Sequence, residues 1–184
     1  HCGEAGYILT EEYIARAKIK PLTKNYNYLS IDDNLIKWFW EKRKLSIETV
    51  RAFDITASME PMMQQRVKSG NEDSKGKWIT RKAINFKYKK DNVLVNIKFR
   101  DPSKNFKMIS GASLIPFNMD AIKNEKECVI VEGEPDCMAY HEAGVKNVIS
   151  VPNGATITLQ EKKIVEETGR LEVISNINLE YLDP

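Results

Sequence analysis

The chain has 184 residues, of which 42% are hydrophobic, and a formal net charge of +2; this excludes a peptide or a low-complexity tail and suffices for one domain or two small ones. No stretch approaches the roughly 20 apolar residues of a membrane-spanning helix, and no charged-then-apolar signal pattern opens the sequence. Three irregularly spaced cysteines, Cys2, Cys128 and Cys137, do not form a disulfide framework. We therefore expect a cytoplasmic protein with no membrane partner.

Basic and acidic residues occupy different parts of the chain. Residues 75–107 hold 11 basic and 2 acidic side chains, whereas residues 118–184 hold 6 basic and 13 acidic ones. This order predicts a polyanion site beside a carboxylate site. Solvated faces that differ in charge are a commoner cause of such runs, and that alternative stays open.

Two helices are predicted early in the chain. Apolar residues between Asp32 and Lys44 recur at helical spacing, and Ser46 is placed to cap a second helix that runs to Phe53. Together these residues predict a helical hairpin packed on a core. The polar, glycine-containing stretch 68–77 predicts a loop.

An antiparallel strand pair is predicted after this loop. Apolar and polar residues alternate over 84–89 and again over 93–100, with a turn between them. We expect a hairpin with one apolar and one cationic face, the latter carrying Lys87, Lys98 and Arg100. A lysine-rich face can also protect an edge strand from aggregation, so the pattern alone leaves both phosphate binding and edge protection open. Lys104 and Lys107, just beyond the hairpin, favour phosphate binding.

The chain then switches to a βαβ pattern. "CVIV" at 128–131 is a continuous apolar run typical of a buried parallel strand, a helix follows from Pro135, and "NVISVP" is a second strand. Ligands collect beyond the carboxyl ends of such strands, and Glu132 is expected there as the last residue of the first strand. Asp136 lies in the first helical turn.

Two carboxylates placed this closely favour a divalent cation, and oxygen ligands favour Mg²⁺ over zinc. For Glu134 we prefer a simpler role, stabilisation of the helix N-terminus. Asn153 and Gly154, at the end of the second strand, are further candidates for ligand binding, although Asn-Gly is foremost a turn signal.

Three segments carry a family resemblance. "NIKFRDPSKNFKMISG", "VIVEGEPDCMAYHEAG" and "VISVPNGA" resemble the primase portion of phage-type bifunctional DNA primase-helicases, whose core joins a basic subdomain to a TOPRIM domain. The resemblance covers residues 80–155 and, more loosely, 32–56. It implies an α+β basic subdomain (helical hairpin plus antiparallel sheet) at 10–117, an α/β TOPRIM domain with parallel strands at 118–184, and a remnant of a zinc ribbon at 1–9.

The resemblance also implies roles for individual residues. Glu132 matches the catalytic TOPRIM glutamate, implicated in metal binding or proton handling, and Asp136 matches a second acidic residue; we expect both to hold Mg²⁺. The cationic matches, implied to contact nucleotide phosphates and template, are Lys98, Arg100, Lys104 and Lys107, and we expect the three lysines to be catalytic together with Glu132. To the expected nucleotide-binding residues we add Lys87, Asn153 and Gly154.

The implied activity is that of a DNA primase, a nucleotidyltransferase that makes short RNA primers. Its expected partners are single-stranded DNA, ribonucleoside triphosphates and a C-terminal replicative helicase domain. The D-x-D pair that completes a TOPRIM site does not occur after Glu132, so we expect a fragment that is cut before that strand and is inactive alone. Zn²⁺ is expected only in the missing ribbon, with Cys2 as its last ligand.

Two other functions stay open. The chain could be a non-catalytic single-stranded DNA-binding module of a replicative helicase. It could also belong to another TOPRIM enzyme, a topoisomerase or a nuclease.

Overall fold

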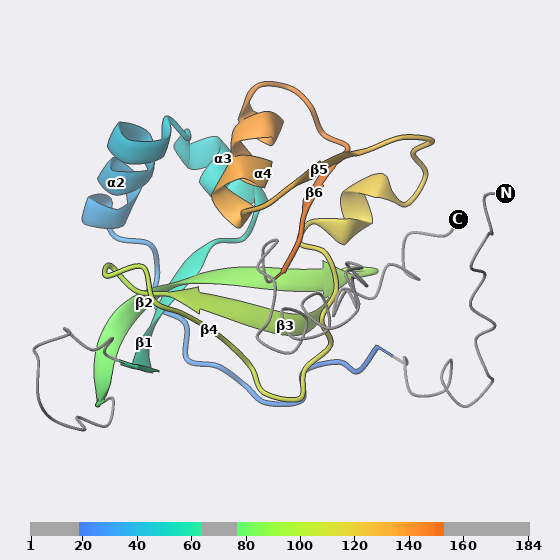
Figure 1. The fold of residues 1–184 in the computed structure, drawn as a ribbon. Helices are drawn as coiled ribbons and strands as arrows, with labels where there is room; N and C mark the ends of the chain where they lie inside the picture. The colour runs from blue at the N-terminus through green and yellow to red at the C-terminus, as the bar shows by residue number, and fades with distance from the viewer. Residues whose placement is uncertain (1–18, 64–76, 153–184) are drawn as a thin grey trace, which may run out of the picture.

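The structure, a computed structural model, describes residues 19–63 and 77–152. In Figure 1, an antiparallel sheet forms one layer and the helices lie together over one of its faces. The mixed α+β fold, with an antiparallel sheet and a parallel strand pair, is thereby confirmed. The elements in chain order are α2 (Asp33–Arg43), α3 (Ile47–Ala52), β1 (Thr56–Met63), β2 (Trp78–Lys90), β3 (Val93–Arg100), β4 (Phe106–Met108), the 3₁₀ turn η1 (Met119–Ile122), β5 (Val129–Val131), α4 (Glu134–Glu142) and β6 (Val148–Ser150).

Helices α2 and α3 form the predicted pair, and each begins at a capping side chain. Oδ1 of Asp32 accepts a hydrogen bond from the backbone N–H of Leu35 at 3.0 Å. Oγ of Ser46 accepts one from Thr49 at 3.2 Å. These caps satisfy N–H groups that have no partner within the helix. The cap at Ser46 is confirmed, whereas the cap at Asp32 was not predicted.

Ser46 also joins α3 to α4, and its replacement by alanine should be measurable. Its Oγ donates to Oε2 of Glu142 at 2.9 Å, and its backbone N–H donates to the same oxygen at 3.2 Å. We expect Ser46→Ala to lower the free energy of unfolding by about 1 kcal/mol, because both the cap and the link through Oγ are lost. Urea denaturation measures the change, with Ser110→Ala at an exposed position as the control. Equal midpoints for the two variants would contradict the role given to Ser46.

The sheet has the order β1-β2-β3-β4, and its register corrects one prediction. Phe86 of β2 pairs with Lys98 of β3, whereas Lys87 pairs with Ile97. Paired residues share a face of the sheet, so the apolar residues of β2 lie beside the cations of β3. The prediction of one apolar and one cationic face is wrong, because the two strands alternate out of phase.

Both faces of the sheet are covered. Phe86 and Tyr88 pack in a core with the helices and Phe117, and all three are almost fully buried. On the opposite face, Phe99 belongs to a second buried cluster against which Tyr26 packs. In Figure 1 the segment before α2 runs along this opposite face. The cations of β3 therefore emerge on the side where the helices lie.

The predicted βαβ unit is present. Strands β5 and β6 pair in parallel, and α4 connects them. Glu132 directly follows β5, which ends at Val131, so it lies just beyond the strand rather than being its last residue. Among the described helices, none is long and apolar enough to cross a bilayer.

Candidate functional site: a cleft between a cationic and an acidic wall

A cleft of about 830 Å³ separates the end of the antiparallel sheet from the turn between β5 and α4. One wall comes from β3, β4 and the loop between them, and the other from residues 132–136. The structure thus brings together, along one cleft, residues from two segments about 30 positions apart in the sequence. The predicted site residues that line it are Lys98, Arg100, Lys104, Lys107, Glu132 and Asp136.

Lys98 and Glu134 form a buried ion pair at the base of the cleft. Nζ of Lys98 lies 2.8 Å from Oε1 of Glu134 and also donates to the carbonyl of Pro152 at 2.8 Å. The hydroxyl of Tyr88 donates to the same carboxylate. Glu134 is only 2% exposed. The pair therefore ties the cationic wall to the acidic wall.

Burial and the negative charge of Glu134 raise the pKa of Tyr88 well above its usual value. Tyr88 is consequently a hydrogen-bond donor at any physiological pH. The predicted role of Glu134 was stabilisation of the helix N-terminus. The structure adds a second role, because its carboxylate orients Lys98.

Arg100 is the most buried cation of the cleft. It is 7% exposed, and its Cζ lies 5.1 Å from the ring centroid of Trp38 and 5.8 Å from that of Phe106. Burial, followed by the charge of nearby Arg43, lowers the pKa of Arg100. Within residues 19–63 and 77–152, no carboxylate forms an ion pair with its guanidinium. The charges of Asp101 and Glu134 partly offset this lowering of the pKa, but neither carboxylate pairs directly with the guanidinium, so this position suits an anionic ligand.

The loop between β3 and β4 presents Lys104 at the rim. Asp101 is buried, and its carboxylate accepts hydrogen bonds from the backbone N–H of Asn105 at 2.9 Å and from its Nδ2 at 2.8 Å. Lys104 adopts a left-handed backbone conformation, with φ of 63°. Asp101 thus closes a tight turn that leaves the exposed lysine at the cleft.

Lys107 borders the cleft, yet its ammonium group points elsewhere. Its Nζ lies 2.8 Å from Oε2 of Glu60 and 5.1 Å from the ring centroid of Phe99. Lys107 pairs with Phe99 in the sheet, which places its side chain on the face opposite Lys98. The expectation that both ammonium groups share the cleft therefore fails for Lys107.

Lys87 also lies away from the cleft. Its Nζ bonds Oδ1 of Asp54 at 3.0 Å and lies over the ring of Tyr28. The prediction that Lys87 shares a face with Lys98 and Arg100 is wrong, because the observed register pairs Lys87 with Ile97.

Glu132 and Asp136 supply the acidic wall. Both are exposed and line the cleft. A Cβ at position 133 would lie 3.0 Å from Oδ2 of Asp136, so glycine there leaves space for this carboxylate. In the described part of the chain, no group of three or more His, Cys, Asp or Glu side chains gathers to hold a metal. Two carboxylates nevertheless fit Mg²⁺, which is commonly bound by one or two carboxylates together with water and substrate phosphates.

Several predicted features lie outside the described residues. These are Asn153 and Gly154, Cys2 with the expected zinc-ribbon remnant at 1–9, and the part of the expected TOPRIM domain at 153–184.

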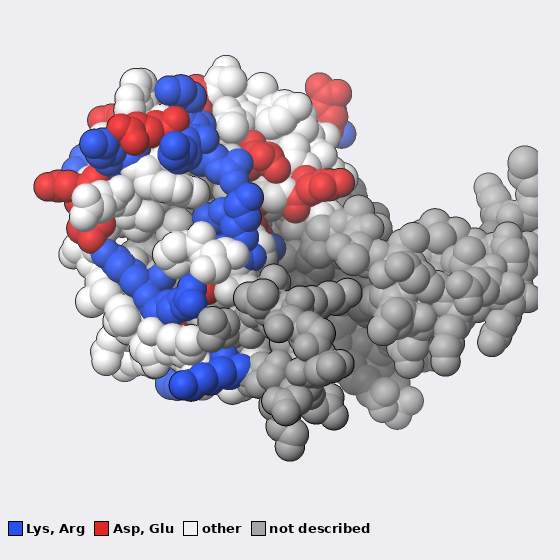
Figure 2. Space-filling model, turned by 60° about the vertical axis from the view of Figure 1, so that its left-hand side comes forward, with Lys and Arg blue, Asp and Glu red and all other residues white. Residues whose placement is uncertain are grey.

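The distribution of charged side chains on the surface is consistent with an anion-binding cleft. Figure 2 shows Lys and Arg side chains in an arc around a hollowed, uncharged area, with acidic groups beyond the arc. A face of this kind attracts phosphate groups over a distance of roughly the Debye length, about 10 Å at moderate salt.

Fold and cleft together define an α+β protein in which a cationic wall from β3, β4 and the loop between them faces the acidic turn of a βαβ unit. Comparisons with known proteins relate the chain to two primase-related proteins. The chain is similar to the Primase homolog protein of Arabidopsis thaliana, with 30% identity over 132 residues that cover 69% of this chain and 39% of that protein. It is also similar to the Twinkle homolog protein, chloroplastic/mitochondrial, of Arabidopsis thaliana, with 38% identity over 84 residues that cover 46% of this chain and 12% of that protein.

The chain is therefore a distant relative of primase-related proteins, and it spans well under two thirds of the length of either relative. No protein-family model and no solved structure matches it.

Proposed function

We propose that this chain is the nucleotide-binding part of a DNA primase that makes short RNA primers on single-stranded DNA. The observation that carries the proposal is the cleft itself, in which Lys98, Arg100 and Lys104 face Glu132 and Asp136. Similarity to a Primase homolog protein supports the same reaction class. The polymerising activity is proposed for the whole protein that carries this chain.

Each wall has a task in this reaction. Arg100 and Lys104 bind phosphate groups of a ribonucleoside triphosphate or of the template, and Lys98, held by Glu134, fixes the position of the acidic turn. Glu132 and Asp136 would hold Mg²⁺. That ion, when bound, neutralises charge that develops on the reacting phosphate. Aligning the reactants in this way is a large part of phosphoryl-transfer catalysis.

A second candidate function is a non-catalytic single-stranded DNA-binding module of a helicase assembly. It is favoured by the small acidic set, since only two carboxylates of the described residues are assigned to the metal. The two functions differ in one outcome, template-dependent incorporation of ribonucleotides.

Binding to single-stranded DNA tests the cationic wall. We expect Lys104→Gln to reduce the slope of log affinity against log salt by about 0.7, the change for one lost phosphate contact on a single strand. Fluorescence anisotropy of a labelled oligonucleotide gives the slope. Lys37→Gln, at an exposed position on α2, is the matched control and should leave the slope unchanged. An unchanged slope for Lys104→Gln would show that the rim does not contact phosphate.

The catalytic part of the proposal is tested with the full-length protein. RNA synthesis on single-stranded DNA, dependent on ribonucleotides and Mg²⁺, is the expected result. DNA binding without any such synthesis would favour the non-catalytic module.

A further inference from the structure

A second hollow, of about 600 Å³, lies between α2 and the sheet; we call it the α2 hollow. Its floor is apolar and includes Leu35, Ala83 and Ile84, with Trp38 beside them. Its volume lies in the range of small-molecule sites, about 300–1,000 Å³. The residues that line both the α2 hollow and the cleft are Arg43, Arg100 and Lys104. The two spaces therefore adjoin at a cationic border, and the proposed function assigns no ligand to the α2 hollow.

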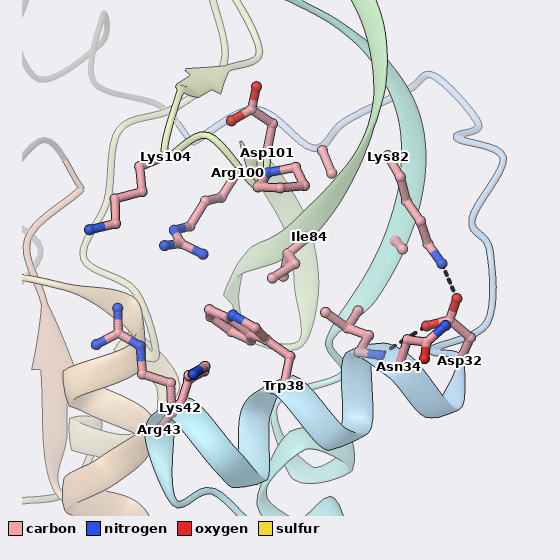
Figure 3. Close-up of a pocket in the computed structure, with 14 residues that line it drawn as sticks. Asp32, Asn34, Trp38, Lys42, Arg43, Lys82, Ile84, Arg100, Asp101 and Lys104 are labelled. Atoms are coloured by element: carbon pink, nitrogen blue, oxygen red, sulfur yellow. Dashed lines mark hydrogen bonds and ion pairs between the residues drawn. The ribbon is translucent and has the colours of Figure 1, made fainter.

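The cationic border has no direct ion pair with a carboxylate of the described residues. Figure 3 shows Arg43 from α2, Arg100 from β3 and Lys104 from the following loop grouped at one end of the α2 hollow. In the described ranges, none of these three cations forms an ion pair with a carboxylate. Asp101 and Glu134 lie near Arg100, but both carboxylates have other partners. Asp101 bonds Asn105 and lies 3.8 Å from Nη1 of Arg81, and Glu134 pairs with Lys98. An anion bound here would reduce the repulsion between the three cations and offset the energetic cost of burying the charge of Arg100.

Flat groups line the middle of the α2 hollow. Cζ of Arg100 lies 5.1 Å from the ring centroid of Trp38, and Cζ of Arg43 lies 5.9 Å from it. Indole rings and guanidinium planes are the groups on which nucleobases stack. At the other end, Lys82 pairs with Asp32, and Asn34 lies beside them with an amide that can pair with a base edge. The anion site, the flat apolar middle and the polar end lie along the α2 hollow in a fixed order. A nucleotide has its phosphate, its base ring and the hydrogen-bonding edge of its base in the same order.

We propose that the α2 hollow binds one nucleotide, with its base beside Trp38 and its phosphate at Arg43, Arg100 and Lys104. The inference rests on the proposed function, since the same cations border the cleft. The nucleotide can come from a single strand of DNA or from a free ribonucleotide, and both present the same chemistry.

The test compares a natural single-stranded oligonucleotide with an abasic strand of equal length. Stacking on one aromatic side chain changes affinity by roughly tenfold or more. We therefore expect Trp38→Leu to weaken binding of the base-bearing ligand that occupies the α2 hollow, the natural strand or a free nucleotide, by at least about tenfold. It should leave binding of the abasic strand unchanged, and Trp38→Phe should restore the affinity. Trp40→Leu, at a side chain that is 58% exposed and does not line the hollow, is the matched control.

A fluorescent ATP analogue, measured on the same variants, distinguishes the two sources. A loss confined to the strand identifies a template nucleotide, and a loss confined to the ATP analogue identifies a free one; both support the inference. If Trp38→Leu does not fold, Asn34→Ala decides, because this exposed residue lines the α2 hollow and not the cleft. It should weaken binding of a ligand that carries a base and leave binding of the abasic strand unchanged.

Two results must be kept apart. If folded Trp38→Leu binds both the natural strand and the ATP analogue with unchanged affinity, the α2 hollow does not bind a nucleotide. The proposed function of the cleft would remain intact. Failure of the unaltered chain to bind any of the three ligands would contradict the proposed function itself.

Discussion

Replacement of Glu134 by alanine should lower the free energy of unfolding by about 3–5 kcal/mol, the usual cost of removing one partner of a buried ion pair. The substitution leaves Nζ of Lys98, whose side chain is 12% exposed, with only the carbonyl of Pro152 as a partner. It also leaves the hydroxyl of Tyr88 without its acceptor. Because single domains are stable by only about 5–15 kcal/mol, such a loss should be visible as a large shift of the thermal midpoint.

Two further variants separate charge from shape. Glu134→Gln keeps an acceptor for Tyr88 and removes only the charge, so it should cost less than the alanine variant. The double variant Glu134→Leu with Lys98→Met replaces the pair by apolar groups and should recover much of the lost stability. A cost below about 1 kcal/mol for Glu134→Ala would mean that water replaces the carboxylate and that the ion pair does not hold the two walls together.

Replacement of Glu132 by glutamine should reduce RNA synthesis by the full-length protein at least about 100-fold, the scale on which loss of one charge-stabilising group acts. Glu132 is exposed and lines the cleft, so stability and DNA affinity should stay close to those of the unaltered protein. The measurement is incorporation of labelled ribonucleotide on a single-stranded template at several Mg²⁺ concentrations.

Glu127→Gln is the matched control. Glu127 is an exposed glutamate that precedes β5, at the opposite end of the strand from Glu132. Full activity of Glu127→Gln together with a strong loss in Glu132→Gln would locate the effect at the carboxyl end of β5. Undiminished synthesis by Glu132→Gln would remove this residue from the site.

Local features of the structure could be predicted from the sequence. Ser46 marked the start of α3, because its side chain satisfies an N–H group three residues further on. Helix α2 was indicated by the helical spacing of its apolar residues, and its cap, Asp32, was not predicted. The continuous apolar run at 128–131 likewise indicated a parallel strand, and residues 129–131 pair with β6 as expected. The expectation that this strand is buried is wrong for Ile130, which is 54% exposed.

Relations between strands could not be predicted in the same way. Alternation describes the faces of each strand separately, and only the register decides which faces coincide. Phe86 pairs with Lys98, and a bulge between Tyr88 and Lys89 shifts the pairing further along. This register sends Lys98 to the helix side and Lys87 to the other side.

The role of Glu134 and the α2 hollow depend on the same long-range packing. In the sequence, Glu134 is an ordinary acidic residue at the start of a helix. No neighbouring residue indicates that Tyr88 and Lys98 bind its carboxylate. Trp38 reads as part of an apolar helix face. Its position beside Arg100 becomes visible only when α2 is placed on the sheet.

The central claim is that the cationic wall and the acidic wall of the cleft bind one metal–nucleotide complex between them. A crystal of the chain grown with Mn²⁺ and a non-hydrolysable ATP analogue tests it most directly, because anomalous scattering locates the ion. The account predicts an anomalous peak at the carboxylates of Glu132 and Asp136, with the triphosphate extending toward Arg100 and Lys104. A nucleotide bound elsewhere on the chain, with no ion at Glu132, would contradict the account.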